Sequence, residues 1–305
     1  MRLSRFCSRL IFFVAPILGA RVTAQAPQLR GTAMLECSGL PCVEVTLASG
    51  KHLRLLVDTG NVNSVLDTAA AKEAEITVAA VNGPDGKPVA GYGRSVLTGV
   101  RLGDVSLGDI KVLVLDVASE VKRDRMPAAD GTLAYTAFRD RLLELDYRRR
   151  TVHVSEPLTA NLPCPRFCGT LTTPTFGNQG PPIVVGTGFS VNAKPISAQI
   201  DTLFTGTMLI YPPSVEKLGL GDAAQTTTKQ FFRYTDEGVE MLEAHSKTEA
   251  FGEHVLVRGA SLYFATPGVH LPDGLFDATV GHALFQDSVL TLDFHDMKLW
   301  IAEAE

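Results

Sequence analysis

The sequence lacks the features that mark nucleic-acid binding, metal binding and serine-hydrolase chemistry. Its 33 acidic residues outnumber its 28 basic ones, and a net charge of −5 argues against a polyanion-binding protein, because phosphate contacts need a basic face. None of its 7 histidines forms a metal-binding pair at helical spacing. The Gly-x-Ser-x-Gly elbow of one large hydrolase class is also missing. We therefore expect no metal, no cofactor and no nucleic-acid partner.

The sequence also has no apolar run that suits a transmembrane helix, for which about 20 residues are needed. A shorter apolar stretch from Leu10 to Ala20 follows a basic start and precedes the small residues Val22-Thr23-Ala24. This pattern is typical of a cleaved secretory signal, so we expect residues 1–24 to be removed. The alternative is an uncleaved anchor, against which Pro16 and the short stretch argue. We expect an exported protein, periplasmic or extracellular, with no stable membrane span after cleavage.

Cysteine is scarce, and one of the 5 cysteines lies in the expected signal. The others are Cys37, Cys42, Cys164 and Cys168. An even number in an exported chain favours disulfides, with three possible pairings. We favour the local pairs Cys37–Cys42 and Cys164–Cys168. A four-cysteine zinc site is the alternative, but neither pair has the two-residue spacing of tight zinc ligands, and the expected compartment is oxidising.

An internal repeat is the most informative feature that the sequence does contain. Asp58-Thr59-Gly60 ends the apolar run LRLLVDTG, and Asp201-Thr202-Leu203 follows 143 residues later in ISAQIDTLFTG. A second pair of matching blocks begins at Asp130 and Asp277. Two blocks that recur in the same order at nearly the same step predict two lobes of one design.

The domain boundaries follow from this repeat. We expect an N-terminal lobe over residues 25–155 and a C-terminal lobe over residues 182–305. The segment between them, residues 156–181, is rich in Pro, Gly and Cys and is predicted to be the interlobe linker.

Within each lobe the pattern is mostly that of strands. A hairpin is expected to turn at Ser49-Gly50, with its second strand ending at Asp58. Helical segments are few: we predict them over Thr68–Ala80, over Pro212–Leu218, and as short turns around Phe138 and Phe285. The fold class is therefore all-β with a few short helices.

These motifs resemble those of the retropepsin/pepsin-like aspartic peptidases. VDTG around Asp58 matches the active-site signature, and the sequence around Asp201 resembles the Asp-Thr-Gly-Phe-Thr-Gly form of bacterial members. The family also has two apolar residues followed by glycine late in each lobe, here Thr132-Leu133-Ala134 and Thr279-Val280-Gly281. The resemblance covers almost the whole mature chain and implies two homologous β-barrel-like lobes.

The resemblance implies an aspartic-type endopeptidase in which Asp58 and Asp201 face each other. Two carboxyl groups in a low-dielectric cleft do not both ionise, so one acts as general base on a water while the other acts as general acid. The paired threonines, Thr59 and Thr202, are implied to hydrogen-bond across the interface and to hold the two loops. The partner is a peptide or protein substrate. Because both half-sites lie in one chain, a monomer is sufficient to form the site.

Two positions depart from the family pattern. Leu203 stands where the first copy has Gly60, and it would cost about 1–3 kcal/mol in strain if the backbone there needs a positive φ. Ala134 replaces the glycine of the first lobe's late element, with a similar cost of about 1–3 kcal/mol if the space is tight. The alternative function is therefore a catalytically impaired, two-lobed peptide-binding protein.

The same family covers its substrate cleft with a mobile hairpin, or flap. The candidate here is Val81–Arg94, in which Gly91 and Gly93 give mobility and Tyr92 could hydrogen-bond to substrate. The alternative is a plain mobile hairpin. A counterpart in the second lobe would lie around Phe231–Gly238.

Overall fold

The computed structural model describes residues 30–117, 129–159, 161–164, 167–175, 180–221, 226–230, 239–264 and 275–303. The predicted signal, residues 1–24, lies outside these ranges. The all-β prediction is confirmed, because strands dominate the described residues and the longest α-helices among them, α1 (Thr68–Glu73) and α3 (Pro212–Lys217), have only 6 residues each.

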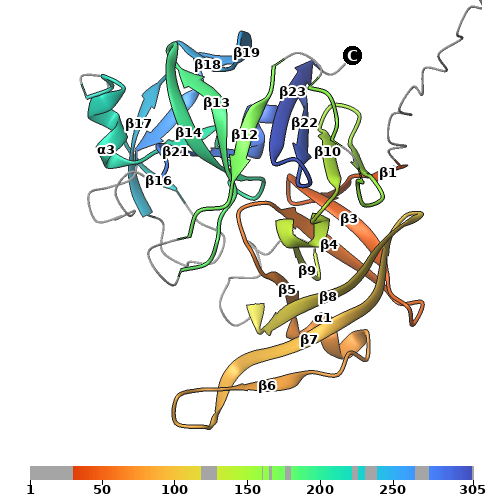
Figure 1. Ribbon diagram of the computed structural model, residues 1–305. Coiled ribbons are helices and arrows are strands. Elements are labelled where there is room, and N and C mark those ends of the chain that lie inside the picture. The colour runs from red at the N-terminus through yellow and green to blue at the C-terminus, as the bar shows by residue number, and fades with distance from the viewer. Residues whose placement is uncertain are drawn as a thin grey trace, which may run out of the picture.

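The first half of the chain forms an eight-stranded sheet, at the bottom of Figure 1. Its order is β2 (Leu35–Cys37), β3 (Leu40–Thr46), β4 (His52–Asp58), β9 (Gly131–Ala134), β5 (Ser64–Asp67), β8 (Val105–Leu115), β7 (Pro88–Leu102) and β6 (Ala79–Asn82). The hairpin predicted at Ser49-Gly50 joins β3 to β4, and Gly50 has the positive φ of 80° that its turn needs.

The second half contributes most of a fifteen-stranded sheet. Its main path is β1 (Arg30–Ala33), β11 (Thr151–Val154), β10 (Leu142–Asp146), β22 (Ser288–Asp293), β23 (Lys298–Glu303), β12 (Gly169–Thr172), β13 (Val185–Val191), β14 (Lys194–Asp201), β21 (Ala278–Gly281), β15 (Met208–Ile210), β20 (Ser261–Phe264), β17 (Val239–His245) and β16 (Thr226–Gln230). Off this path, β18 (Thr248–Phe251) pairs with β13 and with β19 (His254–Arg258).

The two halves are joined through this larger sheet. Strand β10 of the first half pairs antiparallel with β22 of the second, and β12, which lies within the predicted linker, pairs with β23. The strands that connect the halves therefore come from both of them, and β10, β22 and β23 lie side by side in the upper part of Figure 1.

The internal repeat of the sequence has a counterpart in the strand topology. In the first half β4 pairs parallel with β9, which places Asp58 opposite Ala134. In the second half β14 pairs parallel with β21, which places Asp201 opposite Gly281. A short 3₁₀ helix follows each of these pairs: η2 (Tyr135–Phe138) and η3 (His282–Phe285). The short turns predicted around Phe138 and Phe285 are thus confirmed.

The core explains why the repeat recurs. The repeat aligns Phe138 with Phe285 and Leu145 with Leu292, and all four side chains are fully buried.

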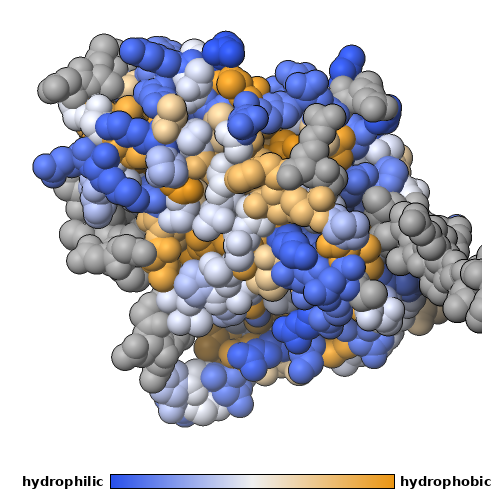
Figure 2. Space-filling view, turned by 45° about the horizontal axis from the view of Figure 1, so that its top comes forward, coloured by the Kyte–Doolittle hydropathy of each residue, from blue (hydrophilic) through white to orange (hydrophobic). Residues whose placement is uncertain are grey.

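On the surface, Figure 2 shows hydrophilic residues over much of one face, with hydrophobic residues between them across its middle.

One predicted helix is shorter than expected. Helix α1 begins as predicted, with the Asp67 carboxylate accepting a hydrogen bond from the N–H of Ala69 at 2.7 Å. It ends at Glu73 rather than at Ala80. Glu75 then takes a left-handed conformation (φ 58°), and the β-branched residues that follow favour extended backbone over helix. Strand β6 begins at Ala79.

The cysteines form the two local pairs. Cys37–Cys42 and Cys164–Cys168 are disulfide-bonded, with Cα–Cα distances of 5.8 and 5.9 Å. This pairing uses all four cysteines outside the predicted signal. No helix within the described ranges is long and apolar enough to span a membrane.

Candidate active site

Asp58 is the last residue of β4, and its side chain is buried, with only 2% of the residue exposed. Two donors from the following loop hold the carboxylate. The N–H of Gly60 donates to Oδ1 at 3.1 Å, and the side-chain amide of Asn61 donates to Oδ2 at 2.8 Å. The apolar strand thus delivers a carboxyl group to the end of β4, and the tight loop after it provides the hydrogen bonds that the burial requires.

Asp201 occupies the matching place at the end of β14. Its Oδ1 accepts hydrogen bonds from the N–H groups of Leu203 at 2.9 Å and Phe204 at 3.2 Å. The first of these repeats the Gly60–Asp58 hydrogen bond of the other half. Leucine at position 203 therefore keeps the backbone donor that glycine would provide.

Gly60 shows how closely the two aspartate loops approach. A Cβ atom built on Gly60 would lie 2.5 Å from Cγ of Asp201 and within 2.8 Å of both its carboxylate oxygens. A Cβ atom does not approach a non-bonded atom this closely, so position 60 accepts only glycine while the Asp201 side chain keeps its place. The carboxylate of one half thus rests directly on the loop that follows the aspartate of the other half.

The two threonines cross-link these loops. The N–H of Thr59 donates to Oγ1 of Thr202, and the N–H of Thr202 donates to Oγ1 of Thr59, each at 3.1 Å. Each hydroxyl also donates to a carbonyl of the opposite half, that of Thr59 to Ile200 at 2.8 Å and that of Thr202 to Val57. Both threonines are fully buried. This reciprocal set holds the two loops in one fixed arrangement.

The electrostatic environment separates Asp58 from an ordinary carboxylate. Burial, and next the neighbouring charge of Asp201, raise the pKa of Asp58 from 3.8 to about 7, against the lowering effect of the hydrogen bonds from Asn61 and Gly60. Asp58 therefore holds its proton over most of the acidic range. Two carboxyl groups with one proton between them can act as acid and base in the same reaction.

The backbone strain considered for Leu203 is absent. Leu203 is not among the described residues with a positive φ, so leucine needs no unusual backbone there. Its half-buried side chain packs against a cluster from the first half, formed by Cys37, Leu40, Cys42 and Leu56. The bulk that replaces glycine is thus directed into an apolar contact that includes the Cys37–Cys42 disulfide.

Ala134 also fits without strain, although the matching position of the second half does not tolerate a methyl group. Ala134 is fully buried, and its N–H donates to the hydroxyl of Ser64 at 2.9 Å. A Cβ on Gly281 would lie 2.3 Å from the carbonyl oxygens of both Phe204 and Gly206. The second half therefore still requires its glycine, whereas the first half has space for alanine.

A hydrogen-bonded chain beside the aspartates is not evident from the sequence. The amide nitrogen of Gln199 donates to the carbonyl of Gly60 at 3.1 Å, its oxygen accepts from Thr279 at 3.2 Å, and Thr279 bonds to the hydroxyl of Tyr211 at 2.9 Å. Gln199 lies two residues before Asp201, where the first half has Leu56, so the repeat gives no signal for it.

The candidate flap is a hairpin. Strands β6 and β7 pair antiparallel across Val81–Arg94, and the N–H of Gly83 donates to the carbonyl of Lys87 at the turn. Tyr92 is 52% exposed. Gly91 has a φ of 75°, and a Cβ on Gly93 would lie 2.3 Å from the side chain of Val78. In Figure 1 this hairpin extends beyond the rest of its sheet. Its proposed counterpart, Phe231–Gly238, lies outside the described residues, although the flanking strands β16 and β17 pair.

Comparison with known proteins agrees with this geometry. Residues 43–136 match the family model described as aspartyl protease, and this range contains Asp58-Thr59-Gly60 and strands β4 to β9. This stretch of the chain is similar to aspartyl proteases. The resemblance to the retropepsin/pepsin-like aspartic peptidases is thereby confirmed.

One solved structure agrees with this fold. Conglutin gamma, a basic 7S globulin from lupine seeds, shares 10% sequence identity with a TM-score of 0.50, over 92% of this chain and 96% of that one. The match to basic 7S globulin from soybean covers 92% of this chain and 96% of that one, at 10% sequence identity and a TM-score of 0.46. At this identity the lupine protein is evidence for the two-lobed fold alone. No curated protein matches the sequence significantly.

Proposed function

We propose that the chain is an aspartic-type endopeptidase in which Asp58 and Asp201 activate a water molecule. The observation that carries the proposal is the pairing of a buried Asp58, whose pKa is raised in part by Asp201, with an Asp201 carboxylate that rests on Gly60. A protonated and an ionised carboxyl group in fixed loops supply general acid and general base together.

In the proposed reaction Asp58 carries the shared proton and Asp201 is ionised. Water attacks the peptide carbonyl carbon and gives a proton to Asp201, while Asp58 gives its proton to the carbonyl oxygen, which forms a geminal diol. The C–N bond then breaks, the leaving nitrogen takes the proton from Asp201, and a diol hydroxyl returns a proton to Asp58. The two carboxyl groups end as they began, and no covalent intermediate forms.

The remaining residues have supporting roles in this proposal. Thr59 and Thr202 position the aspartates through their reciprocal hydrogen bonds, and the hairpin of Val81–Arg94 would cover bound substrate. Secretion or periplasmic export is also proposed here, and the disulfides Cys37–Cys42 and Cys164–Cys168 are consistent with an oxidising compartment. One chain provides both aspartates, so the proposed site does not need a dimer.

A second candidate is a peptide-binding protein of the same fold that does not cut. Leu203 is the observation that favours it, because it departs from the glycine of the family signature beside Asp201, although its side chain packs into the apolar cluster of the first half. In such a protein the cleft would bind peptide, but the two carboxyl groups would not act on a water.

Cleavage of a denatured protein substrate between pH 3 and 7 distinguishes the two candidates. An endopeptidase should produce fragments that disappear on Asp58→Asn and on addition of a pepstatin-like inhibitor. A purified, folded chain that binds the inhibitor but leaves the substrate intact across this range would exclude cleavage and favour the binding protein.

A further inference from the structure

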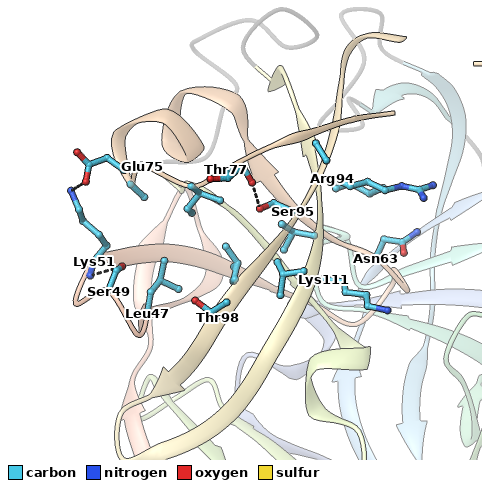
Figure 3. Close-up of a pocket in the computed structure, with 17 residues that line it drawn as sticks. Leu47, Ser49, Lys51, Asn63, Glu75, Thr77, Arg94, Ser95, Thr98 and Lys111 are labelled. Carbon is cyan, nitrogen blue, oxygen red and sulfur yellow. Dashed lines mark hydrogen bonds and ion pairs between the residues drawn. The ribbon is translucent and has the colours of Figure 1, made fainter. Parts of the chain in front are cut away.

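A cavity of about 1040 Å³ lies in the first half of the molecule and does not include the aspartate pair. Every residue that lines it falls between Leu47 and Leu113, and Asp58 is not among them. Its walls come from the β3–β4 turn, the segment after α1, and strands β7 and β8 (Figure 3). The cavity is therefore a site of its own.

The charges in the cavity are unevenly distributed. At one end Lys51 and Glu75 form an ion pair with an N–O distance of 3.5 Å, which leaves that end neutral. At the other end Figure 3 shows Arg94 and Lys111 beside Asn63. Both cations are exposed, and within the described residues neither forms an ion pair. Two unpaired cations in a chain of net charge −5 make this end attractive to an anion.

The rest of the lining is partly apolar and partly hydroxylic. Buried Leu47, Leu97 and Val112 contribute apolar surface. The hydroxyl of Ser95 donates to the carbonyl of Thr77 at 2.7 Å, and its oxygen remains an acceptor toward the cavity. Apolar groups together with hydroxyls suit a ligand that has both side chains and amide groups.

Exposed apolar side chains are concentrated in the hairpin that contributes to the cavity wall. Among the described residues, four of the six large apolar side chains that are exposed fall within one stretch of the hairpin and its base: Val78, Val89, Tyr92 and Val96. Val96 lines the cavity and is 44% exposed. Val96 therefore offers an apolar contact at the cavity that a ligand side chain can cover.

We propose that this cavity binds an acidic, partly apolar segment of a polypeptide. Carboxylate side chains of the segment would pair with Arg94 and Lys111, its apolar side chains would cover Val96 and the buried floor, and its amide groups would bond to the hydroxyls. A fatty acid would need a closed apolar pocket around its chain, which this mixed lining does not provide. Binding here does not depend on peptide cleavage, so this proposal and the proposed function can fail separately.

The test measures binding in the Asp58→Asn background, where the proposed cleavage cannot destroy the probe. The probe is a fluorescein-labelled peptide of about ten residues in which Glu and Leu alternate, followed by fluorescence anisotropy. Reversing both cations, Arg94→Glu with Lys111→Glu, should weaken binding by at least about tenfold, because each exposed charge pair contributes modestly and the reversal adds repulsion. Arg258→Glu, a single charge reversal at the exposed last residue of β19 in the other half, should change affinity by less than about twofold, and it is compared with Arg94→Glu alone.

Three results would overturn the proposal. The first is equal affinity of the double variant and its parent. The second is equal affinity for a probe with Gln in place of Glu, since the recognised feature is the carboxylate. The third is displacement of the probe by a pepstatin-like inhibitor, which would place the peptide in the aspartate cleft instead. Thermal unfolding of each variant confirms that it is folded, which is expected because both cations are exposed and unpaired.

Discussion

The raised pKa of Asp58 predicts that the protein loses stability as the pH rises toward neutrality. The folded state holds the Asp58 proton up to about pH 7, whereas the unfolded chain releases it near 3.8. Between these values the unfolded state binds fewer protons, so the free energy of unfolding falls with rising pH and levels off above about 7. A shift of this size corresponds to about 4 kcal/mol at most, because each pKa unit contributes about 1.4 kcal/mol.

Asp58→Asn removes this dependence. The variant should gain stability relative to the parent as the pH rises from 4 to 7, by up to about 4 kcal/mol. Urea unfolding at a series of pH values measures the difference. Glu249, whose pKa burial also raises to about 7, makes stability fall in the same direction, but it is present in both proteins and cancels.

Asp277→Asn is the matched control, because its effect has the opposite sign. Burial opposes ionisation of Asp277, but hydrogen bonds from Lys217, Ser197 and Ser214 outweigh it and lower its pKa. Stability from this group is present above its unfolded pKa and is lost as the pH falls through the lower folded pKa. The control should therefore be less stable than the parent at pH 7. An Asp58→Asn variant whose stability difference from the parent stays constant from pH 4 to 7 would refute the reasoning about Asp58.

Three further predictions concern the loops around the aspartates. Gly60→Ala should abolish peptide cleavage and destabilise the fold by about 1–3 kcal/mol, because its methyl group would overlap the Asp201 carboxylate. Gly221→Ala is the control: it has open space around it and should leave both cleavage and the free energy of unfolding unchanged. Thr59→Val should lower the free energy of unfolding by about 1–3 kcal/mol, because it leaves buried backbone groups without a hydrogen-bond partner. Thr59→Ser keeps the hydroxyl and should restore most of that loss in a thermal unfolding measurement. Equal effects of the two variants would contradict the role of the hydroxyl. Leu203→Gly should lower the free energy of unfolding by about 1–2 kcal/mol, because it removes the half-buried leucine side chain from its cluster. The variant should still cleave peptide, since the hydrogen bond to Asp201 comes from the backbone N–H of residue 203. Loss of cleavage in a folded variant would show that the leucine side chain itself is needed.

The repeat made much of the fold predictable from the sequence. Asp58 and Asp201 end matching strands, and Phe138 and Phe285 end matching short helices, because each pair occupies the same place in a repeated buried design. The helix predicted over Thr68–Ala80 was too long, since apolar spacing says little about the left-handed Glu75 that ends it.

The candidate site was only partly predictable, because its finer features depend on contacts between distant residues. The apolar cluster that contacts Leu203 belongs to the other half of the chain, and no local sequence pattern reveals this contact. It is formed by Cys37, Leu40, Cys42 and Leu56. The bond from Gln199 to Gly60 joins residues 139 positions apart and has no counterpart in the repeat. Such contacts differ between the two halves, so the internal repeat of the sequence does not predict them.

The pH dependence of kcat/KM for a peptide substrate tests the acid–base pair most directly. The proposed roles predict a rate that falls as the pH rises through about 7, where Asp58 loses its proton, and that is lost at every pH in Asp58→Asn. A rate that rises through neutrality to a plateau, or a profile that Asp58→Asn leaves unchanged, would contradict the account.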